Sequence, residues 1–326
     1  MNGTDFASMS GMIKIYTATD ILAWQEPEWL IGDYIHVGEL GLLYGPPGSG
    51  KSFLALDWAL HIATGQPWLG RFPVKRGPVF YFVGEGVASL KKRLVAWSEA
   101  RRCSLHELGA YFQCRAVSLR QDETITAIQE ALIFFEDPQG KMGPGDICPS
   151  LIVVDTLSQF FGGGDENGAD MTHFVDNLRV LSRDVDCAVL IIHHTNKSGL
   201  SERGHTSLRG NIDVAYRCHG VREGRRLTGM LLENDKQRDA AEAEALPLRL
   251  IPSVRSLVVA PALTGSTSVE SVFRVIQDHP NLRLGELFAL TEVSPATVKR
   301  VIEVLLRSGR ITKENHRFVE KMAHAE

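Results

Sequence analysis

The stretch GLLYGPPGSGKSFLALDWAL, residues 41–60, decides the fold of this chain. An apolar run leads into a glycine-rich turn that ends in Lys51 and Ser52 and opens a helical pattern. The order GxxxxGK[ST] between a strand and a helix is typical of a phosphate-binding loop. A turn rich in glycine and proline can also serve only to connect a strand to a helix, but this residue order in this context favours nucleotide binding.

The loop predicts a set of contacts with ATP and Mg²⁺. Backbone N–H groups of the turn and the positive end of the following helix can hold the phosphates. Lys51 is expected to reach the β and γ phosphates, and the Ser52 hydroxyl is expected to ligate Mg²⁺. The residues predicted to bind the nucleotide are Gly45, Pro46, Pro47, Gly48, Ser49, Gly50, Lys51, Ser52 and Phe53.

Apolar, β-rich runs alternate with helical patterns from about residue 39 to 235, which predicts an α/β fold with a mainly parallel sheet flanked by helices. The predicted strands are 40–44, 79–83, 151–155, 188–193, 216–222 and 227–234, the last two as a hairpin turning at 223–225. The predicted helices are 51–64, 87–103, 122–136 and 171–186, and the predicted surface loops are 137–149 and 195–211.

A chain of 326 residues has room for a large core and a smaller module. The predicted division is an N-terminal lead-in at 1–38, an ATPase domain at 39–260, a linker at 261–268 and a C-terminal module at 269–326. Helical spacing at 269–278 and 284–290, a third helix starting at 294–295 and a hairpin at 310–319 follow the order of a winged helix-turn-helix. A small helical module for protein contacts is the alternative.

The charge distribution bears on DNA binding. The net charge of −4 argues against a protein coated in basic residues, but the segment 294–321 carries seven Lys or Arg against three Glu. The third helix of the C-terminal module would present Thr297, Lys299 and Arg300 to DNA. The aliphatic runs are only as long as a strand, and the N-terminus lacks the basic stretch followed by an apolar stretch that marks a signal peptide. These two features predict a soluble cytoplasmic protein. The five scattered cysteines form no CxxC motif and are expected to be buried thiols.

Two carboxylates are the candidates for hydrolysis. The run at 151–154 ends in Asp155, which is typical of a buried strand that delivers a Mg²⁺ ligand to its carboxyl end. Glu85 follows the run VFYFV between two glycines and is the predicted general base. A helix-capping role is the alternative for Glu85, and Asp165 and Glu166 are weaker competitors.

Two polar pairs complete the candidate machinery. His193 and His194 close the strand AVLII, and His194 is predicted to sense the γ-phosphate; neighbouring strand residues face opposite ways, so a shared metal is rejected. Lys236 and Arg238 lie two apart at a strand end and are predicted to project the same way, towards a neighbouring subunit's nucleotide. A solvated turn is the alternative for this second pair.

With these features in this order, the chain resembles the RecA-like hexameric ATPases, and among them the RepA-type replicative helicases, AAA ATPases of plasmids and phages. The similarity covers roughly residues 20–255, including the lead-in at 29–41, GEG at 84–86 and HHTNKSG at 193–199. It implies a RecA-like P-loop core, a homo-oligomeric ring that is hexameric in this family, with ATP between subunits, and single-stranded DNA near the central loops. It also implies that the segment 195–211 faces DNA through Lys197, Arg203 and Arg209.

Two functions remain open on the sequence. The first is an ATP-driven DNA motor, a ring helicase of a mobile element that acts in replication. The second is an ATP-switched DNA-binding protein, because the C-terminal module departs from the compact plasmid enzyme and favours origin recognition, loading, recombination or regulation. A small-molecule kinase is disfavoured, since no lid with clustered arginines is evident.

Overall fold

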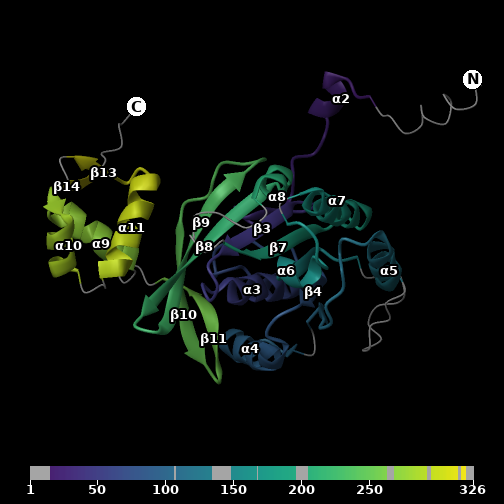
Figure 1. The fold of residues 1–326 in the computed structure, drawn as a ribbon, viewed down its shortest axis with the longest axis horizontal. Coiled ribbons are helices and arrows are strands. Elements are labelled where there is room, and N and C mark those ends of the chain that lie inside the picture. Colours follow the sequence, from purple (N-terminus) through teal and green to yellow (C-terminus); the bar gives the residue numbers. More distant parts are fainter. Residues whose placement is uncertain are drawn as a thin grey trace, which may run out of the picture.

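The computed structural model describes residues 15–105, 108–133, 148–166, 168–195, 205–262, 268–291, 295–314 and 317–320. Its centre is a nine-stranded sheet in the order β11-β10-β9-β8-β3-β7-β6-β4-β5 (Figure 1). The parallel strands are β3 (Leu40–Gly45), β4 (Val79–Val83), β5 (Ala110–Gln113), β6 (Leu151–Asp155), β7 (Ala188–His194) and β8 (Val214–Glu223). The antiparallel strands β9 (Arg226–Gln237), β10 (Leu246–Ser253) and β11 (Ser256–Pro261) extend the sheet.

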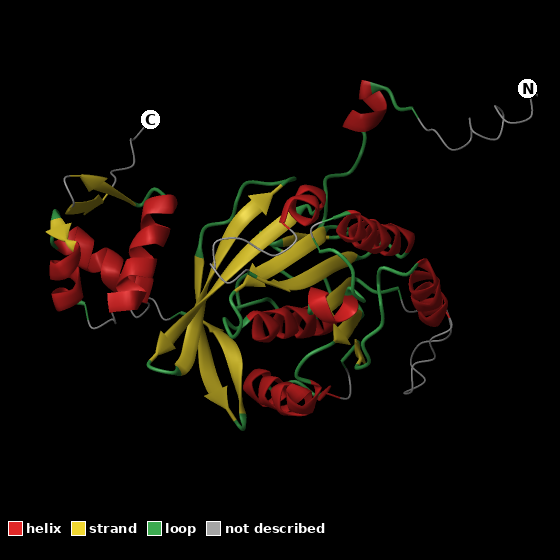
Figure 2. Cartoon of the chain, viewed as in Figure 1, coloured by secondary structure: helices red, strands yellow, loops and turns green. Residues whose placement is uncertain are grey.

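Helices cover both faces of the sheet (Figure 2). One face packs on α3 (Lys51–Thr64) and α4 (Val87–Arg101). The other face packs on α5 (Asp122–Ile133), α6 (Leu157–Phe160), α7 (Ala169–Asp184) and α8 (His205–Asn211). The predicted α/β class with a mainly parallel sheet is therefore confirmed.

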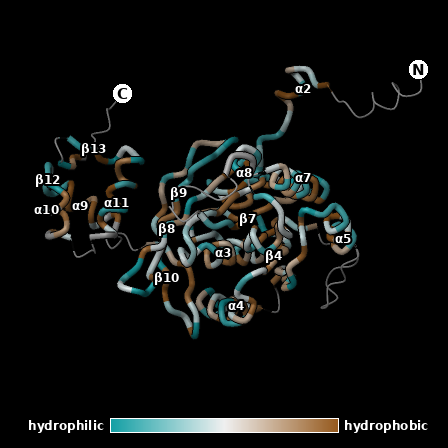
Figure 3. Tube along the Cα trace, viewed as in Figure 1, coloured by the Kyte–Doolittle hydropathy of each residue, from teal (hydrophilic) through white to brown (hydrophobic). Residues whose placement is uncertain are grey.

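The strands at the centre are apolar because both their faces are buried. Successive residues of β7 alternate between the two cores, so that Leu190 and Ile192 pack towards α3 while Val189 and Ile191 pack towards α7. All six residues of β3 are buried as well, and Figure 3 shows that these central strands are largely hydrophobic. The parallel pairing of β3, β4, β6 and β7 brings their carboxyl ends to one edge of the sheet.

The predicted hairpin is formed by β8 and β9 and turns at Gly224 and Arg225. Three strands of the central sheet were not predicted. The strand β5 is only partly buried and has four residues, and β10 and β11 lie in a stretch whose prolines and polar residues masked the alternation. The sheet therefore extends beyond residue 235, where the prediction ended it.

The predicted loop at 195–211 is wrong at its C-terminal end, where the described residues form α8. Leu208 is fully buried against the sheet core and Ile212 follows it, so this segment has the apolar contacts that a helix needs. The polar and glycine-rich composition of the segment concealed this helix. Residues 196–204 lie outside the described residues.

The C-terminal module has three helices and a small antiparallel sheet: α9 (Ser268–Asp278), β12 (Leu282–Arg283), α10 (Leu284–Leu290), α11 (Pro295–Arg307), β13 (Ile311–Glu314) and β14 (Arg317–Glu320). The three predicted helices and the hairpin are present, and the short β12 was not predicted. Val272, Ile276 and Leu305 form its core. This core includes Leu231 of β9, so the module packs on the ATPase sheet through the β8–β9 hairpin.

The N-terminal lead-in forms α2 (Ala18–Leu22), β1 (Trp29–Ile31) and β2 (Ile35–His36). The two strands pair, and Leu30 and Ile31 are buried in the main core. The short α2 has no buried residue and stands away from the body in Figure 1. None of the helices in the described part of the chain combines the length and the apolar character needed to cross a membrane.

Candidate active site

The phosphate-binding loop connects β3 to α3 and is closely packed against strands β8 and β9. No side chain caps the N-terminus of α3, and Gly50 precedes it with a φ of 101°. A Cβ atom on Gly45 would lie 2.3 Å from the Cys218 carbonyl oxygen, and one on Gly50 would lie 2.6 Å from Met230. Glycine is therefore required at both positions, because strands β8 and β9 hold the loop against the start of the helix.

Lys51 is buried at the start of α3. Its Nζ donates to the carbonyls of Gly45 at 2.8 Å and Pro46 at 3.0 Å, and lies 3.1 Å from His194 Nδ1. Burial lowers the pKa of Lys51 to about 8, and the charges of Asp155 and Glu85 oppose this shift. A polyphosphate beside Nζ would supply the negative charge that this buried ammonium needs.

Ser52 and Asp155 meet across a sequence separation of about one hundred residues. Ser52 Oγ donates to Asp155 Oδ1 at 3.2 Å, and Tyr81 Oη donates to Asp155 Oδ2 at 2.8 Å. Asp155 is buried at the end of β6, and burial raises its pKa against the effect of these two hydrogen bonds. A divalent cation would favour the ionised carboxylate, and a hydroxyl beside a carboxylate offers the oxygen ligands that Mg²⁺ prefers.

Glu85 lies just past β4, at the same edge of the sheet. The adjacent pairing of β4 with β6 sets its position, because Gly84 N donates to the Asp155 carbonyl at 2.6 Å. Thr156 Oγ1 donates to Glu85 Oε1 at 3.1 Å, and Gln159 Nε2 does so at 3.4 Å. The carboxylate is solvent-exposed and oriented, which suits a group that must take a proton from water.

The residues at this edge fit Mg-ATP. Among the described residues, the buried hydroxyls of Ser49 and Thr195 have no hydrogen-bond partner, and both belong to the phosphate-binding loop or contact it, since Thr195 N donates to the Gly45 carbonyl. Buried hydroxyls without partners are costly, and phosphate oxygens are suitable acceptors for them. Lys51, Ser52 and the glycine-rich backbone would hold the phosphates, and Ser52 with Asp155 would hold the cation.

Comparison with known proteins shows the family of this chain. The family model described as "AAA domain" matches residues 20–199, which is more than half of the chain. The chain belongs to the AAA domain family. It is an ATPase by this membership and by its P-loop core. A solved structure of the RadB recombinase is similar to this chain with a TM-score of 0.49 and 17% sequence identity, over 70% of this chain and 92% of that one.

In this AAA domain the two histidines at the end of β7 have different surroundings. His193 is buried, whereas His194 is half-buried and lies beside Lys51. The pairing of β3 with β7 places His194 opposite Gly45, at the entrance of the phosphate-binding loop. His194 is thus the histidine that lies beside the phosphate-binding loop, and its role as a sensor of the γ-phosphate stays a prediction.

Lys236 and Arg238 lie at the opposite edge of the sheet, because β9 runs antiparallel to β8 and pairs Gln237 with Val214. Lys236 Nζ donates to the carbonyls of Arg209 and Ile212, and Arg238 donates to Asp213 at 2.8 Å. Both side chains contact the segment 209–213 of their own chain, and their projection towards a neighbouring subunit's nucleotide stays a prediction. They are roughly 15 Å, the length of β3, from their own phosphate-binding loop and cannot serve it.

Arg209 has a different environment from the predicted DNA contact. It forms an ion pair with Asp235 at 2.7 Å, and Tyr44, the residue before Gly45, donates to the same carboxylate. Burial raises the pKa of Asp235, but the hydrogen bonds from Tyr44 and Arg209 outweigh it and lower the pKa. The charge of Arg209 is therefore engaged in joining α8 to β3. The other two predicted contacts, Lys197 and Arg203, lie outside the described residues.

The three residues of α11 that are predicted to contact DNA have different surroundings. Lys299 is exposed. Thr297 and Arg300 line a cavity between α11 and the β8–β9 hairpin, and Arg300 donates to the Gly220 carbonyl at 2.8 Å. Arg300 is itself exposed, as Lys299 is, and the contact of all three residues with DNA stays a prediction.

Sequence reasoning missed several functional neighbours. Tyr81, Thr156 and Gln159 orient the two carboxylates, and their roles depend on contacts between strands that are far apart in the chain. Tyr81 was hidden within an apolar strand, where an aromatic residue usually signals packing. The position of Thr156 directly after Asp155 was the one available sign.

Proposed function

We propose that this protein is a Mg-ATP-hydrolysing, DNA-associated motor of the RepA-like ring helicase type, acting in the replication of a mobile element or phage. The observation that carries the proposal is the convergence of Lys51, Ser52, Asp155 and Glu85 at one edge of the sheet. Each group has the role in phosphoryl transfer that its position suggests.

The residues divide the work of hydrolysis. Mg-ATP supplies the phosphoanhydride and the cation that stabilises its charge. Lys51 neutralises the terminal phosphates, and Ser52 and Asp155 hold the cation, with Tyr81 fixing the carboxylate. Glu85, oriented by Thr156 and Gln159, accepts a proton from the attacking water. His194, next to Lys51, links the state of the phosphates to the segment that follows β7.

A homo-oligomeric ring, hexameric in the family that the chain resembles, is the proposed assembly. The N-terminal arm supports it, because Ile15, Leu22 and Trp24 are 90%, 86% and 58% exposed within the described part of the chain. Exposed apolar clusters of this kind mark protein interfaces. Lys236 and Arg238 support it too, since they lie on the edge away from their own site and are proposed to reach a neighbour's nucleotide.

Mixing two inactive variants tests the role of Arg238 across the interface. Lys51→Ala inactivates a subunit's own site, and Arg238→Ala removes the cation offered to the neighbour. Random mixing in a ring should restore roughly a quarter of wild-type ATP turnover, because an Arg238→Ala subunit regains a complete site beside a Lys51→Ala subunit. Phosphate release at equal total protein measures the effect.

The control is a mixture of Lys51→Ala with the Lys51→Ala/Arg238→Ala double variant, which contains no complete site. Arg238 also pairs with Asp213 in its own chain. If its role is confined to that pair, the first mixture will be as inactive as the control, and the trans assignment will be wrong.

DNA is proposed to contact the segment 195–211 through Lys197 and Arg203, with Arg209 anchoring the segment. The anchor supports coupling, because α8 is joined through Asp235 to Tyr44 at the base of the phosphate-binding loop. Single-stranded DNA should therefore stimulate ATP turnover, by about tenfold if the contact controls the catalytic geometry. Turnover with a poly-dT oligonucleotide, compared with a duplex of equal length, provides the measurement; an equal rate without DNA would contradict the motor.

An ATP-switched DNA-binding protein is the second candidate. The proposed winged-helix module favours it, since α11 contacts the β8–β9 hairpin and that hairpin packs on the phosphate-binding loop. In this case the duplex would change turnover more than the single strand, and ATP would change duplex affinity. The same pair of oligonucleotides therefore separates the two functions.

A further inference from the structure

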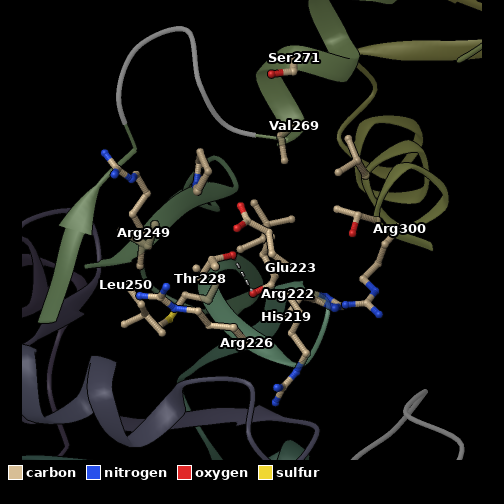
Figure 4. Close-up of a pocket in the computed structure, with 18 of the residues that line it drawn as sticks. His219, Arg222, Glu223, Arg226, Thr228, Arg249, Leu250, Val269, Ser271 and Arg300 are labelled. Atoms are coloured by element: carbon tan, nitrogen blue, oxygen red, sulfur yellow. Dashed lines mark hydrogen bonds between the residues drawn. The ribbon is translucent and has the colours of Figure 1, made fainter. Parts of the chain in front are cut away.

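A cavity of about 720 Å³ lies between the C-terminal module and the ATPase sheet, and residues 45–53 of the phosphate-binding loop are not among those that line it. Its walls come from the β8–β9 hairpin, from β10 and from α9 and α11. Figure 4 shows Arg249 and Arg300 on opposite sides of it, with Arg222 and Arg226 between them and Val269 and Ser271 of α9 above. Both parts of the chain are therefore needed to form it.

The cavity is strongly basic. Four arginines line it, namely Arg222, Arg226, Arg249 and Arg300, and Glu223 is the one carboxylate among the lining residues. Within the described part of the chain, none of these arginines forms an ion pair with a carboxylate. Four unneutralised guanidinium groups around one hollow favour an anionic occupant, and their planar donors match phosphate oxygens.

The floor of the cavity is apolar and has a size that suits one nucleotide unit or two. Leu248, Leu250 and Met230 are buried below the arginines. Pockets for small organic ligands have volumes in the range of about 300–1,000 Å³. An occupant with phosphates at the rim and a sugar and base on the aliphatic floor would satisfy both parts of the lining.

We propose that this cavity is a second phosphate-binding site, which takes a nucleoside phosphodiester between the AAA domain and the C-terminal module. A DNA strand and a free dinucleotide share this chemistry. The DNA source rests on the proposed function, whereas the free dinucleotide does not.

The cavity has a direct connection to the phosphate-binding loop. Arg222 Nη2 donates to the Gly48 carbonyl at 2.8 Å, and Arg300 donates to the Gly220 carbonyl on the same strand. Cys218 of this strand donates to the Ser49 carbonyl at 3.3 Å. A phosphodiester that draws Arg222 towards the cavity would therefore release a contact on the loop that holds ATP.

The test uses two arginines that have no role in the ATP site. Arg226→Gln/Arg249→Gln removes half of the basic lining, and Arg225→Gln/Arg255→Gln is the control, since both of its arginines are exposed on neighbouring turns and neither lines the cavity. The probes are a fluorescein-labelled dT15 oligonucleotide and the dinucleotide pTpT. Thermal melting of both variants checks that they remain folded.

The cavity variant should bind at least one probe about tenfold or more weakly, while the control changes by less than about twofold. For dT15, the salt dependence should also fall by about 1.4 in slope, which corresponds to two lost phosphate contacts on a single strand. Loss of dT15 binding alone identifies a DNA strand as the occupant, and loss of pTpT binding alone identifies a free dinucleotide.

The outcomes also separate this inference from the proposed function. If the cavity variant and the control bind dT15 equally well and also bind pTpT equally well, the cavity proposal is overturned and DNA binding stands. If the wild type binds pTpT through these arginines but does not bind dT15, the cavity proposal stands and the DNA function fails. Absence of binding for both probes to the wild type overturns the cavity proposal as well.

Discussion

Replacement of Lys51 by alanine should lower ATP turnover by about 10³-fold, close to the background of the assay. Lys51 Nζ is buried between the loop carbonyls and His194, so no other described cation can take its place beside the terminal phosphates. Mg-ATP affinity should fall with it. Phosphate release and equilibrium binding of a fluorescent ATP analogue measure the two effects.

Loss of folding would not explain this result. Burial lowers the pKa of Lys51 to about 8, so the folded protein gains little from holding this charge, and the alanine variant should melt close to the wild type. Lys92→Ala, an exposed lysine on α4, is the matched control and should keep full turnover. Turnover of Lys51→Ala within a factor of two of the wild type would contradict the assignment of the loop.

Replacement of Glu85 by glutamine should keep Mg-ATP binding and lower turnover by about 10²–10³-fold. Glutamine preserves the size of the side chain and can still accept a hydrogen bond from Thr156, but it cannot take a proton from water. The expected pattern is an unchanged dissociation constant with a reduced rate of the chemical step. Single-turnover phosphate release after preloading with ATP separates the two quantities.

Glu166→Gln is the comparison for this second result, since Glu166 lies in the loop before α7 and was the competing candidate. We expect it to hydrolyse ATP at nearly the wild-type rate. A reversed outcome, with Glu166→Gln inactive and Glu85→Gln active, would move the general base to the other loop and overturn the assignment of Glu85.

The sequence predicts the centre of this fold well because its signals are local. The glycine-rich turn before Lys51 and the apolar run that ends in Asp155 each combine a strand, a turn and a polar end within a few residues. Parallel strands deliver their carboxyl ends to one edge, so the meeting of Ser52 with Asp155 at 3.2 Å follows from the order of these elements.

Features that depend on contacts between residues far apart in the chain could not be predicted from local sequence signals. The helix at 205–211 forms because Leu208 finds a buried position against the sheet, and the polar composition around it gave no sign of this. Arg209 carries a charge that suggested DNA, yet Asp235 and Tyr44, from two other strands, determine its environment. The basic cavity likewise unites arginines from three separate parts of the chain.

The most direct test of the account is an experimental structure with Mg²⁺ and a non-hydrolysable ATP analogue. The account predicts that the β and γ phosphates lie within hydrogen-bonding distance of Lys51 Nζ, that Mg²⁺ contacts Ser52 Oγ on the side of Asp155, and that Glu85 faces the γ-phosphate through a water. A nucleotide bound elsewhere, or a Glu85 carboxylate turned away from its terminal phosphate, would contradict it.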